Sequence, residues 1–185
     1  MSVRIAAWQH IEGRRGFEIA RLCPGLQDGH SITGHSTGED EGRPWGLHYA
    51  LELDAAWTTR SVAVEGMSEE GPWALELRGD GAGHWLRDGA AAPELEGCLD
   101  IDLAATVLTN LLPVRRLDLE VGAAGTLDVI WISIPPEREV RRVPQRYERL
   151  GMHLWRYASA GFEAEIEVDD FGLVTAYAGL ARRVA

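Results

Sequence analysis

Apolar and polar side chains alternate along six short segments of this 185-residue chain. A period of two is the pattern of a β-strand with one buried and one exposed face. Glycine-rich turns such as residues 79–83 separate the segments, which favours antiparallel neighbours. We therefore predict a mainly β protein whose sheet has one dry and one wet face. The six segments are Tyr49–Leu53, Arg60–Val64, Trp73–Arg78, Cys98–Leu103, Arg116–Val121 and Phe162–Val168.

Only two segments suit a helix, so we expect one or two short ones. The first is Ala104–Leu112, and the second is Pro144–Leu150, with proline in a first turn and Gly151 as a stop. Leu127–Ile134 is apolar on both faces, so we predict a strand that the rest of the fold covers on both sides. A weak echo links 51–62 and 166–177, where a strand ends in Asp before a turn; we interpret it as chance, with an internal repeat as the alternative.

Two arginines have the phase of buried residues. Arg115 shares the parity of Leu117, so we expect Arg115 inside and Arg116 on the outer face, and Arg60 is in phase with the apolar residues after it. A buried guanidinium costs several kcal/mol unless it is paired, so each needs a carboxylate, carbonyl groups or part of a ligand. Satisfaction by the protein alone is the alternative, and a bulge at Pro113 would shift the register.

Most charged residues fall on the wet face, which is acidic. Asp100 and Asp102 lie there, about 7 Å apart on one strand. Our interpretation is two solvated aspartates; a metal pair or an acid/base pair is the alternative, but no neighbour in the sequence supplies the further ligands that a metal needs. We therefore predict no metal site and no catalytic residue.

Composition narrows the classes of protein. The length fits one domain over residues 1–185. A net charge of −11 argues against nucleic acid as a partner, and all 18 basic residues are arginine, which excludes lysine chemistry. We interpret the two cysteines as free thiols. The longest uncharged stretch is about half of a bilayer span, so we expect a cytoplasmic protein without stable membrane insertion.

Several segments together resemble the glycolipid-binding family of bacterial proteins, across nearly the whole chain. The most specific is the core that runs from 97–103 (GCLDIDL) to 109–119 (TNLLPVRRLDL). The chain departs from the family pattern at Val107, where the family has proline, and at Leu111, where it has threonine. The resemblance implies a fold similar to that of periplasmic lipoprotein carriers: a strongly curved antiparallel sheet, a half-barrel or open barrel, around an apolar cavity. This chain shows no export signal of the kind those carriers have.

We therefore expect a binding protein that holds an amphipathic, glycolipid-like ligand and needs no cofactor. The head group would meet the arginines and a turn asparagine, and aromatic rings would face the cavity. An enzyme with Asp100 as general base and Arg115 stabilising an anion is one alternative. An interaction module that docks a basic partner on the acidic face is another. The predicted ligand-binding residues are Arg60, Arg115, Asn110, Trp57, Trp85 and Tyr147.

Overall fold

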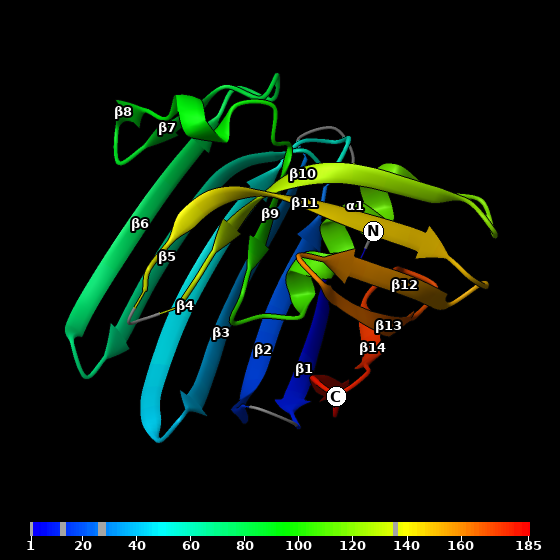
Figure 1. The fold of residues 1–185 in the computed structure, drawn as a ribbon, viewed down its shortest axis with the longest axis horizontal. Coiled ribbons are helices and arrows are strands. Elements are labelled where there is room, and N and C mark those ends of the chain that lie inside the picture. Colours follow the sequence, from blue (N-terminus) through cyan, green and yellow to red (C-terminus); the bar gives the residue numbers. More distant parts are fainter. Residues whose placement is uncertain (1, 12–13, 26–28, 135–136) are drawn as a thin grey trace.

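The computed structural model describes residues 2–11, 14–25, 29–134 and 137–185. Within them, fifteen strands form a single, strongly curved sheet (Figure 1). The strands are β1 Arg4–His10, β2 Arg15–Pro24, β3 His30–Asp40, β4 Arg43–Leu53, β5 Thr59–Ser68, β6 Gly71–Gly79, β7 Trp85–Arg87, β8 Ala90–Ala91, β9 Asp100–Leu103, β10 Ala124–Ile132, β11 Val140–Arg149, β12 Leu154–Ser159, β13 Phe162–Val168, β14 Val174–Tyr177 and β15 Ala181–Arg183. The mainly β, curved fold is confirmed.

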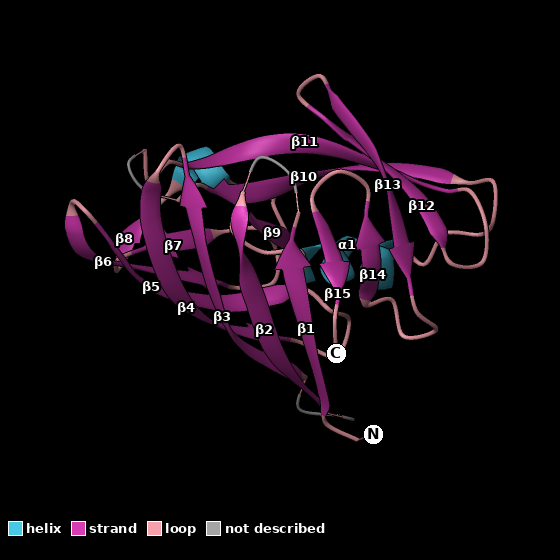
Figure 2. Ribbon diagram, turned by 90° about the horizontal axis from the view of Figure 1, so that it is seen from below, coloured by secondary structure: helices cyan, strands magenta, loops and turns pink. Residues whose placement is uncertain are grey.

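The sheet consists of two runs of sequential strands. Its order is β8-β7-β6-β5-β4-β3-β2-β1-β15-β14-β13-β12-β11-β10-β9, so pairing of β1 with β15 joins the two runs. Neighbouring strands are antiparallel except for β9 and β10, which are parallel. Seen from below, the sheet curves so that β1–β6 lie on one side and β10–β11 on the other (Figure 2).

Alternating side chains build the inner face of the long strands. Val62, Val64 and Leu77 are fully buried or nearly so, as the period of two predicts for β5 and β6. Val129 and Ile130 on β10 are adjacent and both buried, which confirms that this strand is covered on both faces. No helix in the described ranges has the length and apolar character needed to cross a membrane.

Two short helices lie inside the curve of the sheet (Figure 2). These are the 3-10 helix η2, Leu108–Asn110, and the α-helix α1, Leu111–Leu117; a further 3-10 helix, η1, spans Pro93–Leu95. The Leu108, Leu111 and Leu112 side chains are buried in the core. Residues 104–117, which we call the inserted segment, thus fill the place where we expected an apolar cavity.

Three of the predicted segments differ in the structure. Arg116–Val121 is not a strand: α1 runs to Leu117, and Asp118, in the left-handed region at φ 43°, ends it. Pro113 is tolerated because it lies in the first turn, where backbone N–H groups have no partner within the helix. The expected helix over Ala104–Leu112 starts only at Leu108.

The second expected helix, Pro144–Leu150, is also wrong, because these residues belong to strand β11. Val143, Gln145 and Tyr147 are buried in alternation, which is the strand period. Pro144 fits because β11 pairs with β12 only from Arg146 onward, so the missing N–H falls outside that pairing.

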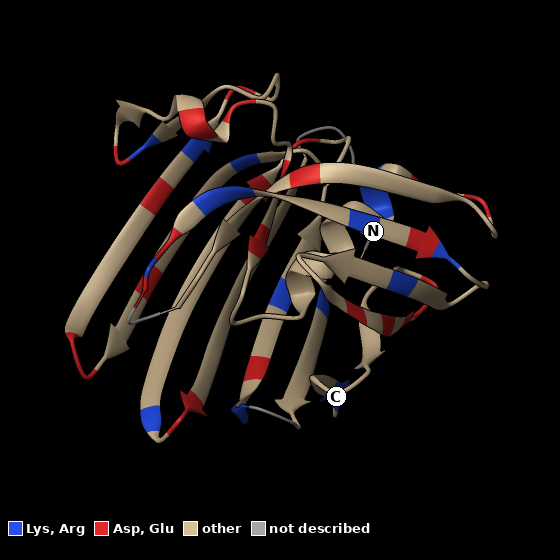
Figure 3. Ribbon diagram, in the orientation of Figure 1, with Lys and Arg blue, Asp and Glu red and all other residues tan. Residues whose placement is uncertain are grey.

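The acidic face carries interspersed arginines (Figure 3). Glu76 is paired with Arg78 at 2.5 Å and Glu148 with Arg146 at 2.8 Å, and all four side chains are at least partly exposed. Such surface pairs contribute little to stability. They do divide the negative charge of the wet face into smaller areas.

Candidate functional site

Polar residues of the inner face hold the backbone of residues 104–107. Arg14 Nη1 donates to the carbonyl of Ala104 at 2.7 Å, and Ser36 Oγ donates to that of Ala105 at 2.6 Å. The carboxylate of Glu18 accepts from the Val107 N–H at 2.7 Å. A buried backbone segment without regular structure needs such partners, so these three side chains fix the segment inside the sheet.

Glu18 is a buried carboxylate held by hydrogen-bond donors. Its side chain is 1% exposed, and the Tyr49 hydroxyl donates to it at 2.7 Å. Burial raises the pKa of Glu18 from 4.5 to about 7, although these hydrogen bonds pull it the other way. The group belongs to the fold and lies beneath the inserted segment.

Asn110 and Tyr147, two of the predicted ligand residues, meet in this interior. The Tyr147 hydroxyl donates to Asn110 Oδ1 at 2.9 Å, and Asn110 Nδ2 donates to the Val107 carbonyl at 3.1 Å. Both side chains are buried. They therefore anchor η2 to β11.

Asp102 does not face bulk water as we expected. Its carboxylate accepts from Gln145 Nε2 at 2.6 Å, and the same nitrogen donates to the Tyr157 hydroxyl at 3.0 Å. Burial raises the pKa of Asp102 to about 6. The chain of contacts continues the interior network around Tyr147.

Asp100 is also buried, and it corrects our assignment of the two adjacent arginines. Arg116, not Arg115, pairs with it: Arg116 Nε donates to Asp100 Oδ2 at 2.8 Å. Asp100 is fully buried, and this burial raises its pKa despite the ion pair. The parity argument failed because these arginines lie on a helix, where neighbours point about 100° apart. Asp100 thus pairs with Arg116 and not with Arg115, the arginine to which the enzyme alternative assigns an anion.

Arg115 lies between two aromatic rings. Its guanidinium carbon is 5.1 Å from the ring centre of Trp57 and 4.9 Å from that of Phe171, within the range of a cation–π contact. His30 stacks on Trp57 at 4.0 Å, and Arg4 lies over the Phe171 ring at 4.2 Å. Arg115 therefore has aromatic neighbours where we expected a carboxylate or a ligand.

Two turns of the same design present these rings. Asp54 Oδ1 accepts from the N–H groups of residues 56 and 58, and Asp169 Oδ1 accepts from those of residues 171 and 173. The fourth residue of each turn has positive φ: Trp57 at 68° and Gly172 at 95°. The echo that we interpreted as chance thus has a structural counterpart. For a bulky residue such as Trp57, this φ is strained and needs support from its surroundings.

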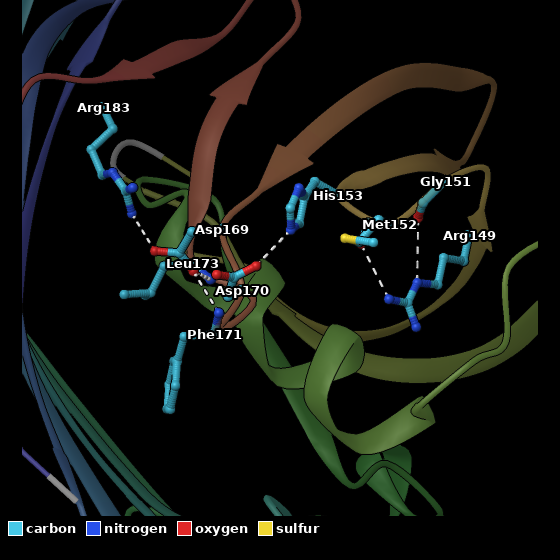
Figure 4. A network of polar contacts seen from close by, with 9 residues as sticks. All are labelled: Arg149, Gly151, Met152, His153, Asp169, Asp170, Phe171, Leu173 and Arg183. Carbon is cyan, nitrogen blue, oxygen red and sulfur yellow. Dashed lines mark hydrogen bonds and ion pairs between the residues drawn. The ribbon is translucent and has the colours of Figure 1, made fainter.

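A pocket of about 250 Å³ opens beside Arg115. Figure 4 shows much of its wall: Asp169 pairs with Arg183 at 2.7 Å, and His153 with Asp170 at 2.8 Å. Arg149 donates from each of its three guanidinium nitrogens, to the carbonyls of Gly151, Leu119 and Met152. The pocket is lined by Val114, Arg115, Asp118, Arg149, Met152, His153, Trp155, Val168, Asp169, Asp170, Phe171 and Gly172.

Arg115 is the unsatisfied cation of this pocket. Among the described residues, no carboxylate forms an ion pair with it. Its Nε is buried and likewise has no hydrogen-bond partner there. Because an unmet buried donor costs about 1–3 kcal/mol, the geometry favours an acceptor from outside the chain.

Arg60 and Trp85 do not join this pocket. Arg60 is exposed, 3.6 Å from Asp54, because it is the extra residue of a β-bulge where β5 passes the Glu52/Leu53 step of β4. Its predicted inward position is wrong. Trp85 is buried on β7, and its Nε1 donates to the Cys98 carbonyl at 2.9 Å, which is a packing role.

The family is decided by comparison with known proteins. The sequence model of a family described as "Putative glycolipid-binding" matches residues 5–183. The chain belongs to this family. Membership of this glycolipid-binding family agrees with the resemblance of the core segments. Within that core, Asn110, Arg115 and Arg116 lie in three different environments.

Solved structures agree with the fold. The crystal structure of a DUF1089 family protein from Pseudomonas aeruginosa is 36% identical, with a TM-score of 0.80, and the match covers 89% of this chain and 92% of that one. A β-barrel-like protein of the DUF1849 family from Brucella abortus is 8% identical, with a TM-score of 0.52 over 98% and 93% of the two chains, and this shows a similar fold alone. No curated protein matched the sequence.

The sequence did not reveal Phe171, His153 or Arg149 as pocket residues. The one signal was the echo of the Asp54 turn at Asp169, which has the same spacing of Asp and backbone donors. Contact of both turns with one arginine depends on the long-range pairing and curvature of the sheet, which a local pattern does not show.

Proposed function

We propose that this member of the glycolipid-binding family is a binding protein, and that an amphipathic, glycolipid-like ligand places its head group against Arg115. The observation that carries the proposal is the buried Arg115 Nε without a partner among the described residues, at the wall of an open pocket. A ligand hydroxyl or acid oxygen that accepts from the terminal guanidinium nitrogens would give this cation the partner that it lacks among the described residues.

The pocket's lining suits a hydroxyl-rich head group. Arg115 offers donors, whereas Asp118 and the Asp170 oxygen that His153 leaves free offer acceptors. Hydroxyl groups can donate and accept, so one polyol meets both kinds of partner. Carboxylates beside the single unsatisfied arginine disfavour a ligand with several negative charges.

The apolar part of the ligand has contacts at the same pocket. Met152 is 70% exposed and lies at the rim with Trp155 and Phe171 in the lining. Methionine adapts its shape to an apolar partner. Because residues 104–117 fill the interior, we place the acyl chain along this rim and not inside the curved sheet.

Titration with n-octyl-β-D-glucoside, kept below its micelle concentration, tests the proposal by calorimetry. We expect saturable binding to the wild type and binding about tenfold weaker, or worse, in Arg115→Gln, which corresponds to a lost charged hydrogen bond. Arg141→Gln is the matched control, because Arg141 lies over the Trp131 ring at 4.7 Å in an exposed position. Equal affinity in all three proteins, or none in the wild type, would overturn the proposal. Binding of a neutral head group should also be insensitive to salt, unlike docking of a basic partner on the acidic face.

A further inference from the structure

A second pocket lies at the other end of strand β14. The Arg115 pocket includes residues 169–172, which precede β14, whereas this one includes Tyr177, at its end. It measures about 280 Å³ and is also lined by His10, Arg14, Asp40, Thr106 and Leu180. One wall is therefore the inserted segment, and the other belongs to the sheet.

The charges of this pocket are already neutralised. Arg14 Nε and Nη2 donate to the two oxygens of Asp40 at 3.0 and 3.1 Å, and its Nη1 is engaged by the Ala104 carbonyl. Such a two-pronged pair leaves no excess charge for an ionic ligand. The pocket thus favours a neutral molecule.

His10 supplies one free acceptor. His10 is only 7% exposed. Burial lowers its pKa to about 4, so the ring is neutral at pH 7. Its Nε2 lies 3.4 Å from Ser36 Oγ, whose own hydrogen is donated to the Ala105 carbonyl at 2.6 Å. Ser36 can therefore only accept, so Nε2 carries the proton and Nδ1 has a lone pair. Among the described residues, Nδ1 has no hydrogen-bond partner.

The rest of the lining is weakly polar. Thr106 Oγ1 is occupied by the Leu103 carbonyl at 3.1 Å and by Thr109 at 3.2 Å. The Tyr177 ring and Leu180 add apolar surface. A ligand here needs a hydroxyl donor for His10 and an apolar face for the ring and Leu180, as a small polyol or pyranose has.

We propose that the His10 pocket is a second binding site, separate from the Arg115 pocket, for a small neutral hydroxylic molecule that donates a hydrogen bond to His10 Nδ1. This site does not depend on the proposed function, because it shares no lining residue with the Arg115 pocket.

NMR of the histidine rings, with D-glucose and myo-inositol as probes, tests this site. We expect at least one probe to shift the His10 Nδ1 resonance saturably in the wild type and equally in Arg115→Gln. Leu180→Trp, which fills the pocket from a partly exposed position, should abolish the shift. In calorimetry, His10→Phe should bind that probe about tenfold more weakly than the wild type, as expected for one lost hydrogen bond. Exposed His35→Phe is the matched control and should bind it as the wild type does.

Two results would overturn the second site. One is the absence of a saturable His10 shift with both probes in the folded wild type. The other is a shift that persists in Leu180→Trp or disappears in Arg115→Gln, because binding would then occur elsewhere. Loss of octyl glucoside binding in Arg115→Gln, with the His10 shift intact, separates the two proposals.

Discussion

Within the described residue ranges, helix α1 carries two arginines, one whose positive charge is paired with a carboxylate and one whose charge is not. On one side, Arg116 donates to Asp100, which is fully buried against β9 and β10. On the other, Arg115 lies between Trp57 and Phe171 at the wall of a pocket and has no carboxylate partner among the described residues. Two residues of the same type, adjacent in the sequence, thus serve different ends. Arg116 belongs to the fold, whereas Arg115 is the residue to which we assign the ligand in our proposal.

The comparison is tested most strongly by removing the buried cation. Arg116→Leu should lower the free energy of unfolding by about 3–5 kcal/mol, because Asp100 stays buried without its partner. Urea denaturation measures this loss, and Arg116→Leu combined with Asp100→Leu should recover much of it. A loss below about 1 kcal/mol in the single variant would contradict the assignment of Arg116 to the fold.

Glu18 is a buried acid with no cation beside it in the described part of the chain, in contrast to Asp100, and its effect on stability should depend on pH. Glu18 has a folded-state pKa of about 7 against 4.5 for the ordinary group. Below pH 4.5 it is protonated in both states; between pH 4.5 and 7 the unfolded chain loses its proton first, so stability falls as the pH rises. Glu18→Gln should remove this fall and gain about 3 kcal/mol relative to the wild type between pH 4 and 8. Urea denaturation at both pH values measures the difference. A constant difference would show that the Glu18 pKa is not raised.

Removing Arg115 should affect binding far more than stability. Arg115→Leu gives up cation–π contacts, so we expect unfolding to become easier by about 1 kcal/mol or less. Binding of octyl glucoside should still fall by about tenfold. Denaturation and calorimetry on one preparation separate the two effects. A loss of stability as large as that of Arg116→Leu would place both arginines in the fold.

The smallest effect is expected at Arg60, outside both environments. Its side chain is 42% exposed and only 3.6 Å from Asp54. Arg60→Leu should change the free energy of unfolding by a few tenths of a kcal/mol and leave octyl glucoside binding unchanged. Reduced binding in this variant would bring Arg60 back into the site.

The sequence predicted best where the strands are long and regularly paired. Leu51, Val62 and Leu77 alternate with polar neighbours, and each is buried on the inner face. There the local period and the tertiary environment agree. The strand at Phe162–Val168 was found for the same reason.

The period of two predicted a strand over Arg116–Val121, and this prediction was wrong. Leu117, Leu119 and Val121 alternate as in a strand, yet Leu117 ends α1 and Val121 is 58% exposed. Inside a closed space, apolar side chains are buried in every direction, so a helix of seven residues shows no distinct face. Arg60 failed for another reason: one bulge residue reverses the inward and outward assignment.

Sequence analysis predicted some residues of the candidate site and missed others. Arg115 and Trp57 were both predicted ligand residues, and they do lie together. Phe171 completes the pair of rings only because the curvature of the sheet brings the turn before β14 to α1 and to the turn after β4. That arrangement depends on long-range strand pairing such as that of β1 with β15.

The Nε–H resonance of Arg115 tests the central claim most directly, because this group has no partner among the described residues. We would follow arginine Nε–H signals in ¹H–¹⁵N spectra while octyl glucoside is added. The account predicts a saturable shift at Arg115 and none at Arg149, whose guanidinium is engaged by backbone carbonyls. An Arg115 signal that stays fixed through saturating probe, or moves no more than that of Arg149, would contradict it.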